Sequence, residues 1–270
     1  MKLKRKIEHT VSGKFAVLFL ISGVLSLIFS FYTDISILAL IGLGLTFWGV
    51  LFFLLKPVNF VEGSLLYNVA LSEYLTIERI INELTNKATG YYMPPIPKDV
   101  YLPEFLKGLK TLVVFVSAEK DATIPSIEEM AKGKFISKNP KGLLLTPPGS
   151  AILTQIEDKS KLDFTKMELN ELCTVLPISI LRDLSLAKGM AMEQNGDLVH
   201  LKIFDSLYKN LYDVRNILKT VNLLGCPIAS AVACALAKTS GKIVTIQKYK
   251  VSPDGSTREV SYLILQGGYR

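Results

Sequence analysis

Two apolar runs near the N-terminus constrain this chain more than any other feature. The stretch reads FAVLFLISGVLSLIFSFY, then TD, then ISILALIGLGLTFWGVLFFLL, and Asp34 at the break is its single formal charge. Each run has about the 20 residues that an α-helix needs to cross the hydrocarbon core of a bilayer. Neither run has the polar stripe of a helix packed on a soluble domain. The sequence therefore predicts a transmembrane helical hairpin over residues 15–56.

Charges on either side of the hairpin predict its orientation. Lys56 follows the second run, and the turn between the runs holds no Lys or Arg. Positive residues resist translocation, so we expect two spans in the cell membrane with both termini cytoplasmic. Residues 1–14 form a basic segment, whose contact with anionic lipid headgroups is worth about 1 kcal/mol per basic residue. The predicted headgroup contacts are Lys2, Lys4, Arg5, Lys6 and Lys14.

Small residues recur at helical spacing in both runs and predict close helix packing. Such positions let two backbones approach in lipid. They serve equally well for the partner run or for a helix of another chain, so the sequence leaves the oligomeric state open. Because neither span contains Lys, Arg, His or Glu, an ion path through the pair is not expected. The predicted packing residues are Ser22, Ser26, Ser30, Gly42, Thr46 and Gly49.

The next part, residues 57–148, is predicted to hold a helix and a proline-rich α/β segment. SLLYNVALSEYLTIERIINELT reads as an amphipathic helix, and its polar face lacks the lysines typical of helices that lie on membranes. Lying along the bilayer and connecting the hairpin to the domain are alternatives, but the simpler interpretation is that it packs on the domain. Residues 111–116, TLVVFV, predict a buried strand, with further candidates at 134–137 and 142–145. The prolines around 94–103 predict an extended loop with at most an edge strand at 99–102.

Residues 149–270 show a regular order of helices and hairpins. Ser150 is a candidate helix cap, and Thr165 with Glu168 has the spacing of a capping box. Asn195-Gly196-Asp197 predicts a hairpin between strands at 189–194 and 198–204. We expect a capped helix after Ser206, a helix opening at Pro227 and closing at Gly241, and a last hairpin of strands 242–248 and 258–265. The predicted class is α+β, an antiparallel sheet with helices packed on one face.

Composition adds little evidence for a partner or a chemistry. The chain has 270 residues and net charge +7, with its excess near the N-terminus, and no basic patch with interleaved aromatics predicts nucleic-acid binding. Cys173, Cys226 and Cys234 are expected to be reduced core thiols.

The run GCPIASAVACALAKTSGKIVTIQKYKVSPDGSTREVSYLIL, residues 225–265, resembles the C-terminal part of vinyl-reductase-like ligand-binding domains, which are similar in fold to the TRAPP subunits of vesicle tethering. The family's paired cysteines are missing from the terminal hairpin, so chemistry carried by them does not transfer. The resemblance implies an apolar pocket beside the alanine-rich helix. The whole chain also looks like archaeal membrane proteins with two N-terminal spans, a likeness that implies no activity. The implied pocket residues are Cys226, Ala229, Ala233, Cys234 and Ala237.

The search for catalytic machinery yields no assignable residue. His9 lies in the basic segment and His200 stands alone on a predicted strand, so neither predicts a general base. Glu119 and Asp121 follow a predicted strand, where an acid–base pair could sit, but no nucleophile accompanies them. No metal-ligand spacing, phosphate-binding loop or dinucleotide fingerprint is present. We expect no catalytic residue, metal or cofactor.

Three functions remain open at this stage. The first is a membrane-anchored cytoplasmic domain that binds a protein partner, or a second copy, as an interaction or scaffold module without catalysis. The second is a sensor or carrier that holds a small apolar ligand in the C-terminal domain. The third, ranked below both, is an enzyme acting on lipid. The sequence favours the first.

Overall fold

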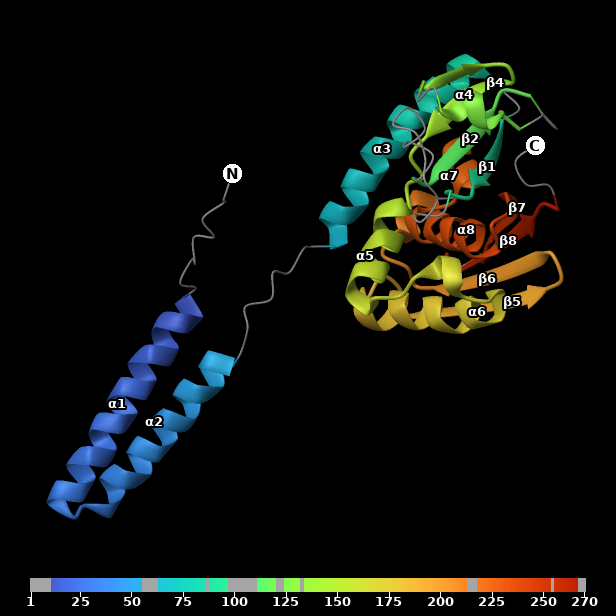
Figure 1. Ribbon diagram of the computed structural model, residues 1–270. Coiled ribbons are helices and arrows are strands. Elements are labelled where there is room, and N and C mark those ends of the chain that lie inside the picture. The colour runs from blue at the N-terminus through green and yellow to red at the C-terminus, as the bar shows by residue number, and fades with distance from the viewer. Residues whose placement is uncertain are drawn as a thin grey trace. The chain divides into compact units, whose positions relative to one another are not determined.

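The computed structural model describes residues 11–54, 63–85, 88–96, 111–119, 124–131, 134–212, 218–253 and 255–266 (Figure 1). The chain forms two compact units, Met1–Val61 and Glu62–Arg270. Several sequence predictions fall outside the described residues. They are the four basic residues Lys2, Lys4, Arg5 and Lys6, the side chain of Lys14, Lys56, the edge strand at 99–102, His9 and Asp121.

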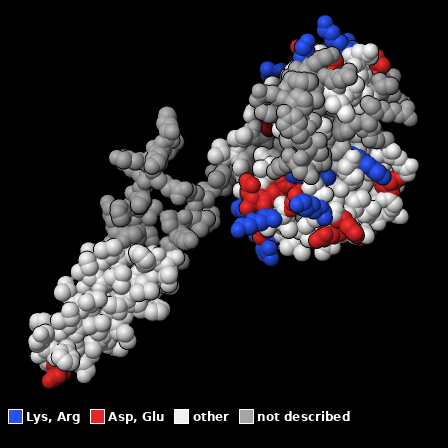
Figure 2. Space-filling model, viewed as in Figure 1, with Lys and Arg blue, Asp and Glu red and all other residues white. Residues whose placement is uncertain are grey.

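The first unit is a helical hairpin. Helix α1 (Val11–Thr33) and helix α2 (Ser36–Leu54) are joined at Asp34, whose φ of 49° turns the chain. Both helices are long and apolar enough to cross a membrane, as the sequence predicted. In Figure 2 the described surface of the hairpin is uncharged except for the acidic residue at its turn. Its exposed side chains are mostly large and apolar, including Phe15, Leu40 and Phe53.

Small side chains line the contact between α1 and α2. Ala16, Gly23 and Ser30 are buried on α1 at intervals of seven residues, and Gly42 and Gly49 are buried on α2 at the same interval. A Cβ added to Gly42 would lie 2.9 Å from the carbonyl oxygen of Gly23, so only glycine fits there.

The predicted packing residues lie at or beside this contact. Ser22, Ser26 and Thr46 are half-buried, and Ser26 Oγ donates a hydrogen bond to the carbonyl oxygen of Leu38 on the other helix at 3.0 Å. Ala16 and Gly23 are small residues at this contact that the sequence analysis did not predict.

The second unit is built on one eight-stranded antiparallel sheet with the order β3-β4-β2-β1-β7-β8-β6-β5. Strands from 57–148 and from 149–270 both join it, because β1 pairs with β2 on one side and β7 on the other. The strands are β1 (Thr89–Met93), β2 (Val113–Ser117), β3 (Ile136–Lys138), β4 (Lys141–Leu145), β5 (Gly189–Asn195), β6 (Leu198–Phe204), β7 (Val244–Val251) and β8 (Thr257–Ile264).

Five of the described α-helices cover one side of this sheet, which we call the inner face, and this confirms the predicted α+β class. They bury a single core against the inward side chains of the strands. Figure 1 shows α8 across the middle of the sheet, and its residues 227–237 are all buried. The helices are α3 (Gly63–Leu84), α5 (Ser150–Ser160), α6 (Leu169–Ile178), α7 (Lys219–Leu224) and α8 (Pro227–Ser240).

On the opposite side of the sheet the described residues place a cover over one part only. Short helix α4 (Ile127–Ala131) packs Met130 against Phe115 and Tyr91 of β2 and β1, forming a second, smaller core. Helices on one face alone were expected, so α4 is an addition to that prediction. Strands β5, β6, β8 and β7 extend beyond this small core.

Buried tyrosines hold the junction between α7 and α8. Tyr74 Oη donates to the carbonyl oxygen of Gly225 at 2.6 Å, and Tyr262 Oη donates to that of Ala229 at 2.9 Å. Tyr92 Oη donates to the carbonyl oxygen of Leu224 at 2.5 Å and contacts Ser230 Oγ at 2.9 Å. Because α3, β1 and β8 supply one tyrosine each, the start of α8 is fixed from three sides.

Two predicted helix caps were wrong. Asp163, not Thr165, accepts the capping bond: its Oδ1 accepts from the Thr165 backbone nitrogen at 3.1 Å and starts a short 3₁₀ turn, residues 164–166. Helix α6 then begins at Leu169 without a side-chain cap. The N-cap of α5 is Gly149 rather than Ser150, because α5 passes so close to α8 that a Cβ on Gly149 would lie 2.0 Å from the Ala231 nitrogen.

The predicted opening and closing of α8 were confirmed, with Pro227 in its first turn and Gly241 as its left-handed cap at φ 63°. Ser206 Oγ accepts from the Tyr208 nitrogen at 3.0 Å, and a 3₁₀ turn, residues 209–212, follows it. The rest of the helix predicted after Ser206, residues 213–217, lies outside the described residues.

Candidate functional site

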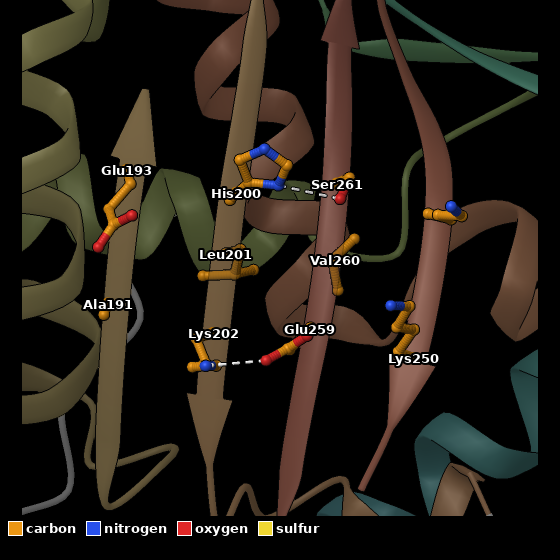
Figure 3. A pocket seen from close by; sticks show the side chains of 10 residues that line it. Ala191, Glu193, His200, Leu201, Lys202, Lys250, Glu259, Val260 and Ser261 are labelled. Carbon is orange, nitrogen blue, oxygen red and sulfur yellow. Dashed lines mark hydrogen bonds and ion pairs between the residues drawn. The ribbon is translucent and has the colours of Figure 1, made fainter. Parts of the chain in front are cut away.

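The candidate site is the outer side of β5, β6, β8 and β7, over which the described residues place no helix, and we call it the open face; Figure 3 shows side chains that line it. It forms a shallow groove of about 400 Å³. Strand alternation builds it, because Val199, Leu201 and Ile203 turn into the core while the residues between them point outward. The outward side chains of the groove are Ala191, Glu193, His200, Lys202, Lys248, Lys250, Glu259 and Ser261.

Strand register arranges these side chains in two rows across the sheet. The first row runs Glu193, His200, Ser261 and Lys248, one residue from each strand. The second row, one step along the strands, runs Ala191, Lys202, Glu259 and Lys250. Side chains directly opposite each other on neighbouring strands lie about 4.5–5.5 Å apart at Cβ. Charges of opposite sign therefore alternate along the second row, from Lys202 to Glu259 to Lys250, while the first row has its acid, Glu193, and its lysine, Lys248, at opposite ends.

An ion pair and a hydrogen bond connect the two central strands. Lys202 Nζ lies 2.8 Å from Glu259 Oε1, and His200 Nδ1 lies 3.1 Å from Ser261 Oγ (Figure 3). The hydrogen bond and charge of Lys202 lower the pKa of the Glu259 carboxyl, and Glu259 likewise raises the pKa of Lys202. Both side chains are about half exposed, so this pair adds little to stability. Its effect is to fix where these charges stand.

Two lysines on β7 complete the face. A β-bulge shifts the register between Ile246 and Lys248, after which Lys248 stands opposite Ser261 and Lys250 opposite Glu259. Both lysines are exposed. Within the part of the chain that the structure describes, neither ammonium forms an ion pair within 4.0 Å. These charges are available to a carboxylate from outside.

Glu193, His200 and Ser261 share a row and invite comparison with a Ser-His-acid triad. A triad also needs backbone donors that stabilise the oxyanion of the transition state. Ser261 lies within a central strand that pairs with β6 on one side and β7 on the other, so the nearby amides belong to the ladder. The row suits recognition of a charged or polar surface better than acyl transfer.

The pocket residues implied by the resemblance lie in the core. Cys226, Ala229, Ala233, Cys234 and Ala237 all have 0% of their surface exposed. A side chain beside a cavity large enough for water would show accessible surface, so no such space touches these five. Burial raises the pKa of Cys234, and Cys226 Sγ accepts a hydrogen bond from the Ala229 nitrogen at 3.4 Å. Both cysteines are packed as small core residues.

The remaining sequence candidates do not meet at one place. Glu119 is exposed just after β2, where its backbone nitrogen donates to Ser117 Oγ at 2.9 Å. Its proposed partner Asp121 lies outside the described residues. Among the described residues, no three His, Cys, Asp or Glu side chains are grouped so that they could hold a metal ion.

Sequence reasoning found part of the open face. The alternation of His200 and Lys202 with apolar residues predicted that one face of β6 is exposed to solvent. Lys248, Lys250 and Glu259 were missed, although polar residues alternate in the same way along β7 and β8. Only the pairing of β6 with β8 brings all four strands together.

A family model described as "Domain of unknown function (DUF7982)" matches residues 2–262. The match runs through both the helical hairpin and the sheet domain. Neither the curated proteins nor the solved structures contain a match to this chain. The comparisons thus lend no support to an archaeal origin or to the likeness with vinyl-reductase-like and TRAPP-subunit domains.

Proposed function

The chain belongs to the DUF7982 family, and we propose that it is a membrane-anchored interaction module without catalysis. The hairpin α1–α2 anchors the chain, with both termini in the cytoplasm. The open face of the sheet domain then binds an acidic segment of a protein partner. The family match through both units supports treating the anchor and the domain as parts of one functional unit.

A single observation carries the partner proposal: half of the sheet has no helix layer over its outer side in the described structure, and that half is lined by ordered charges. Lys202 and Glu259 form an ion pair, and Lys248 and Lys250 are exposed beside it. A surface of fixed, mixed charge selects its partner by electrostatic complementarity and steers the encounter. The surplus positive charge favours an acidic partner.

The anchoring proposal rests on the hairpin and its flanks. Lipid is the solvent that suits a surface of exposed Leu, Ile and Phe, and the close glycine contacts supply packing between the helices. The excess of Lys and Arg at residues 2–14, together with Lys56, favours cytoplasmic termini. The same residues fit contact with anionic headgroups.

The second candidate, a carrier of a small apolar ligand, draws no support from the geometry around α8. Its five pocket residues have no accessible surface. A native mass spectrum of the purified full chain tests it directly, since a bound carrier would show a co-purifying small molecule.

Site-specific photocross-linking in cells tests the proposal. We would place a benzophenone amino acid at Ser261, in the centre of the open face, and at Glu83, an exposed position on α3 as the matched control. We expect a discrete protein adduct at 261 and not at 83. The charge reversal Lys248→Glu with Lys250→Glu should abolish the adduct while the protein remains folded and in the membrane fraction.

Two results would contradict the proposal. One is the absence of a discrete protein adduct at 261. The other is an adduct that persists unchanged in the charge-reversed variant, since the lysines would then have no part in recognition.

A further inference from the structure

The solvent-exposed side of helix α3 changes from apolar to charged along its length. Its buried residues Ala70, Tyr74, Ile77 and Ile81 face the core. With 3.6 residues per turn, the line opposite them runs through residues that are all exposed. In chain order this outward line is Leu65, Val69, Ser72, Thr76, Arg79 and Glu83.

Polarity on this outward line rises from the N-terminal end. Leu65 and Val69 are 56% and 60% exposed, which leaves two large apolar side chains in water. Hydroxyls follow at Ser72 and Thr76, and charges only after them. The first charged residue anywhere in α3 is Glu73, so the first two turns carry no side-chain charge at all. A helix that packs on a domain has no need for this gradient on its solvent side.

The chain that leads into α3 points to what covers these side chains. Residues 55–62 separate the end of α2 at Leu54 from the start of α3 at Gly63. Nine peptide steps reach at most about 30 Å when fully extended. If α2 spans the bilayer, this connection holds the first turn of α3 within about 30 Å of the lipid surface.

We propose that the first two turns of α3 dock on the cytoplasmic lipid surface, with Leu65 and Val69 entering the boundary between headgroups and acyl chains. Apolar side chains of surface-lying helices enter this layer in the same way. The inference rests on the proposed anchor. A protein interface would need about 800 Å² from each partner, far more than two side chains provide, whereas lipid requires no such area. Docking keeps the charged half of α3 in water and limits how the domain can turn on its tether.

Fluorescence quenching by lipid tests the docking. The full chain with Val69→Cys, labelled with NBD, would be reconstituted in vesicles that contain a nitroxide-labelled phospholipid. Glu83→Cys, on the same outward line, is the matched control. Both variants carry Cys173→Ser, because Cys226 and Cys234 are fully buried and Cys173 is only partly so. We expect blue-shifted emission and several-fold stronger lipid quenching at 69 than at 83, reduced towards the control by Leu65→Ser.

A carbonate wash of the same vesicles separates the two possible failures. If the protein stays with the vesicles but the label at 69 is quenched no more than at 83, docking is wrong and the anchor stands. Blue-shifted emission without lipid quenching would mean that protein covers Val69, which also overturns docking. If the protein washes off, the anchor itself is wrong.

Discussion

The hairpin helices and the α7–α8 segment are both apolar enough to span a membrane, yet they have opposite surroundings. Their mean hydropathies are 2.3 and 2.4 for the two hairpin helices and 1.7 for Lys219–Ser240. In the most apolar 18 residues of the third segment 89% are buried inside the domain, against 17% and 11% in the corresponding stretches of the two hairpin helices. Length and mean hydropathy alone do not separate a membrane span from the central helix of a folded core.

The kind of apolar residue does separate them. Helix α8 is rich in alanine, and these small side chains let α5 approach its backbone at Gly149. The hairpin instead turns Leu, Ile and Phe outward, and Gly23, Gly42 and Gly49 form one narrow contact between its helices. Gly225 and Pro227 also break the third segment, so neither of its helices reaches the length of a span.

The largest expected difference in stability between the hairpin and the sheet domain appears at alkaline pH. Burial raises the pKa values of Tyr74, Tyr92, Tyr262 and Cys234 in the folded domain. These groups lose protons in the unfolded chain first, so stability is full below the unfolded pKa values, near 8.5 for Cys and 10 for Tyr, and falls as pH rises above them. Above pH 10 four groups together should lower the free energy of unfolding by about 5 kcal/mol per pH unit.

Urea unfolding of the full chain in detergent, followed by the near-ultraviolet signal of the tyrosines, measures this slope at pH 9 to 11. The hairpin should stay helical throughout. Tyr92→Phe should reduce the slope above pH 10 by one proton, about 1.4 kcal/mol per pH unit. A slope that Tyr92→Phe leaves unchanged would show that this buried phenol is not part of the alkaline transition.

The same Leu→Ala truncation should lower stability in the sheet domain but not in the hairpin. Leu236→Ala in α8 removes a side chain with 0% exposure and should lower the free energy of unfolding of the domain by about 2–5 kcal/mol. Leu40→Ala in α2 removes one that is 73% exposed and, in the proposed membrane, faces lipid. It should leave the thermal melt of the domain and the helicity of the hairpin unchanged. Comparable losses of stability in both variants would contradict the assignment of Leu236 to a packed core and of Leu40 to a lipid-facing surface.

Glycine contacts should matter only where they lie between helices. A Cβ at Gly42 meets backbone atoms of Gly23 and Leu27 at 2.9 Å, whereas one at Gly44 has nothing within 4 Å. Gly42→Ala should therefore force α1 and α2 apart at a cost of about 1–3 kcal/mol, and Gly44→Ala should not. Spin labels at residues 15 and 53, both exposed, would report a longer or broader distance in the first variant alone.

Local signals predicted much of this structure, and long-range pairing accounts for most of what they missed. The spans, the hairpin at Asn195-Gly196 and the limits of α8 each depend on residues close in the chain. The open face depends on β8 lying between β6 and β7, and the single sheet depends on β1 reaching β7, contacts between distant segments that no local pattern encodes. The capping box predicted at Thr165 and Glu168 was wrong because the backbone amide of Thr165 donates instead to Asp163 Oδ1, two residues earlier in the chain.

The smallest effect on stability is expected on the open face, where the sign of a binding change is more informative than its size. Lys202→Ala and Glu259→Ala each break the same exposed ion pair, and neither should shift the thermal melt measurably. Their effects on the adduct formed at residue 261 should be opposite. Glu259→Ala releases the ammonium of Lys202 for an acidic partner and should increase the adduct. Lys202→Ala leaves the Glu259 carboxylate to repel that partner and should decrease it. A change in the same direction in both variants would mean that the partner reads the shape of this face and not its charge.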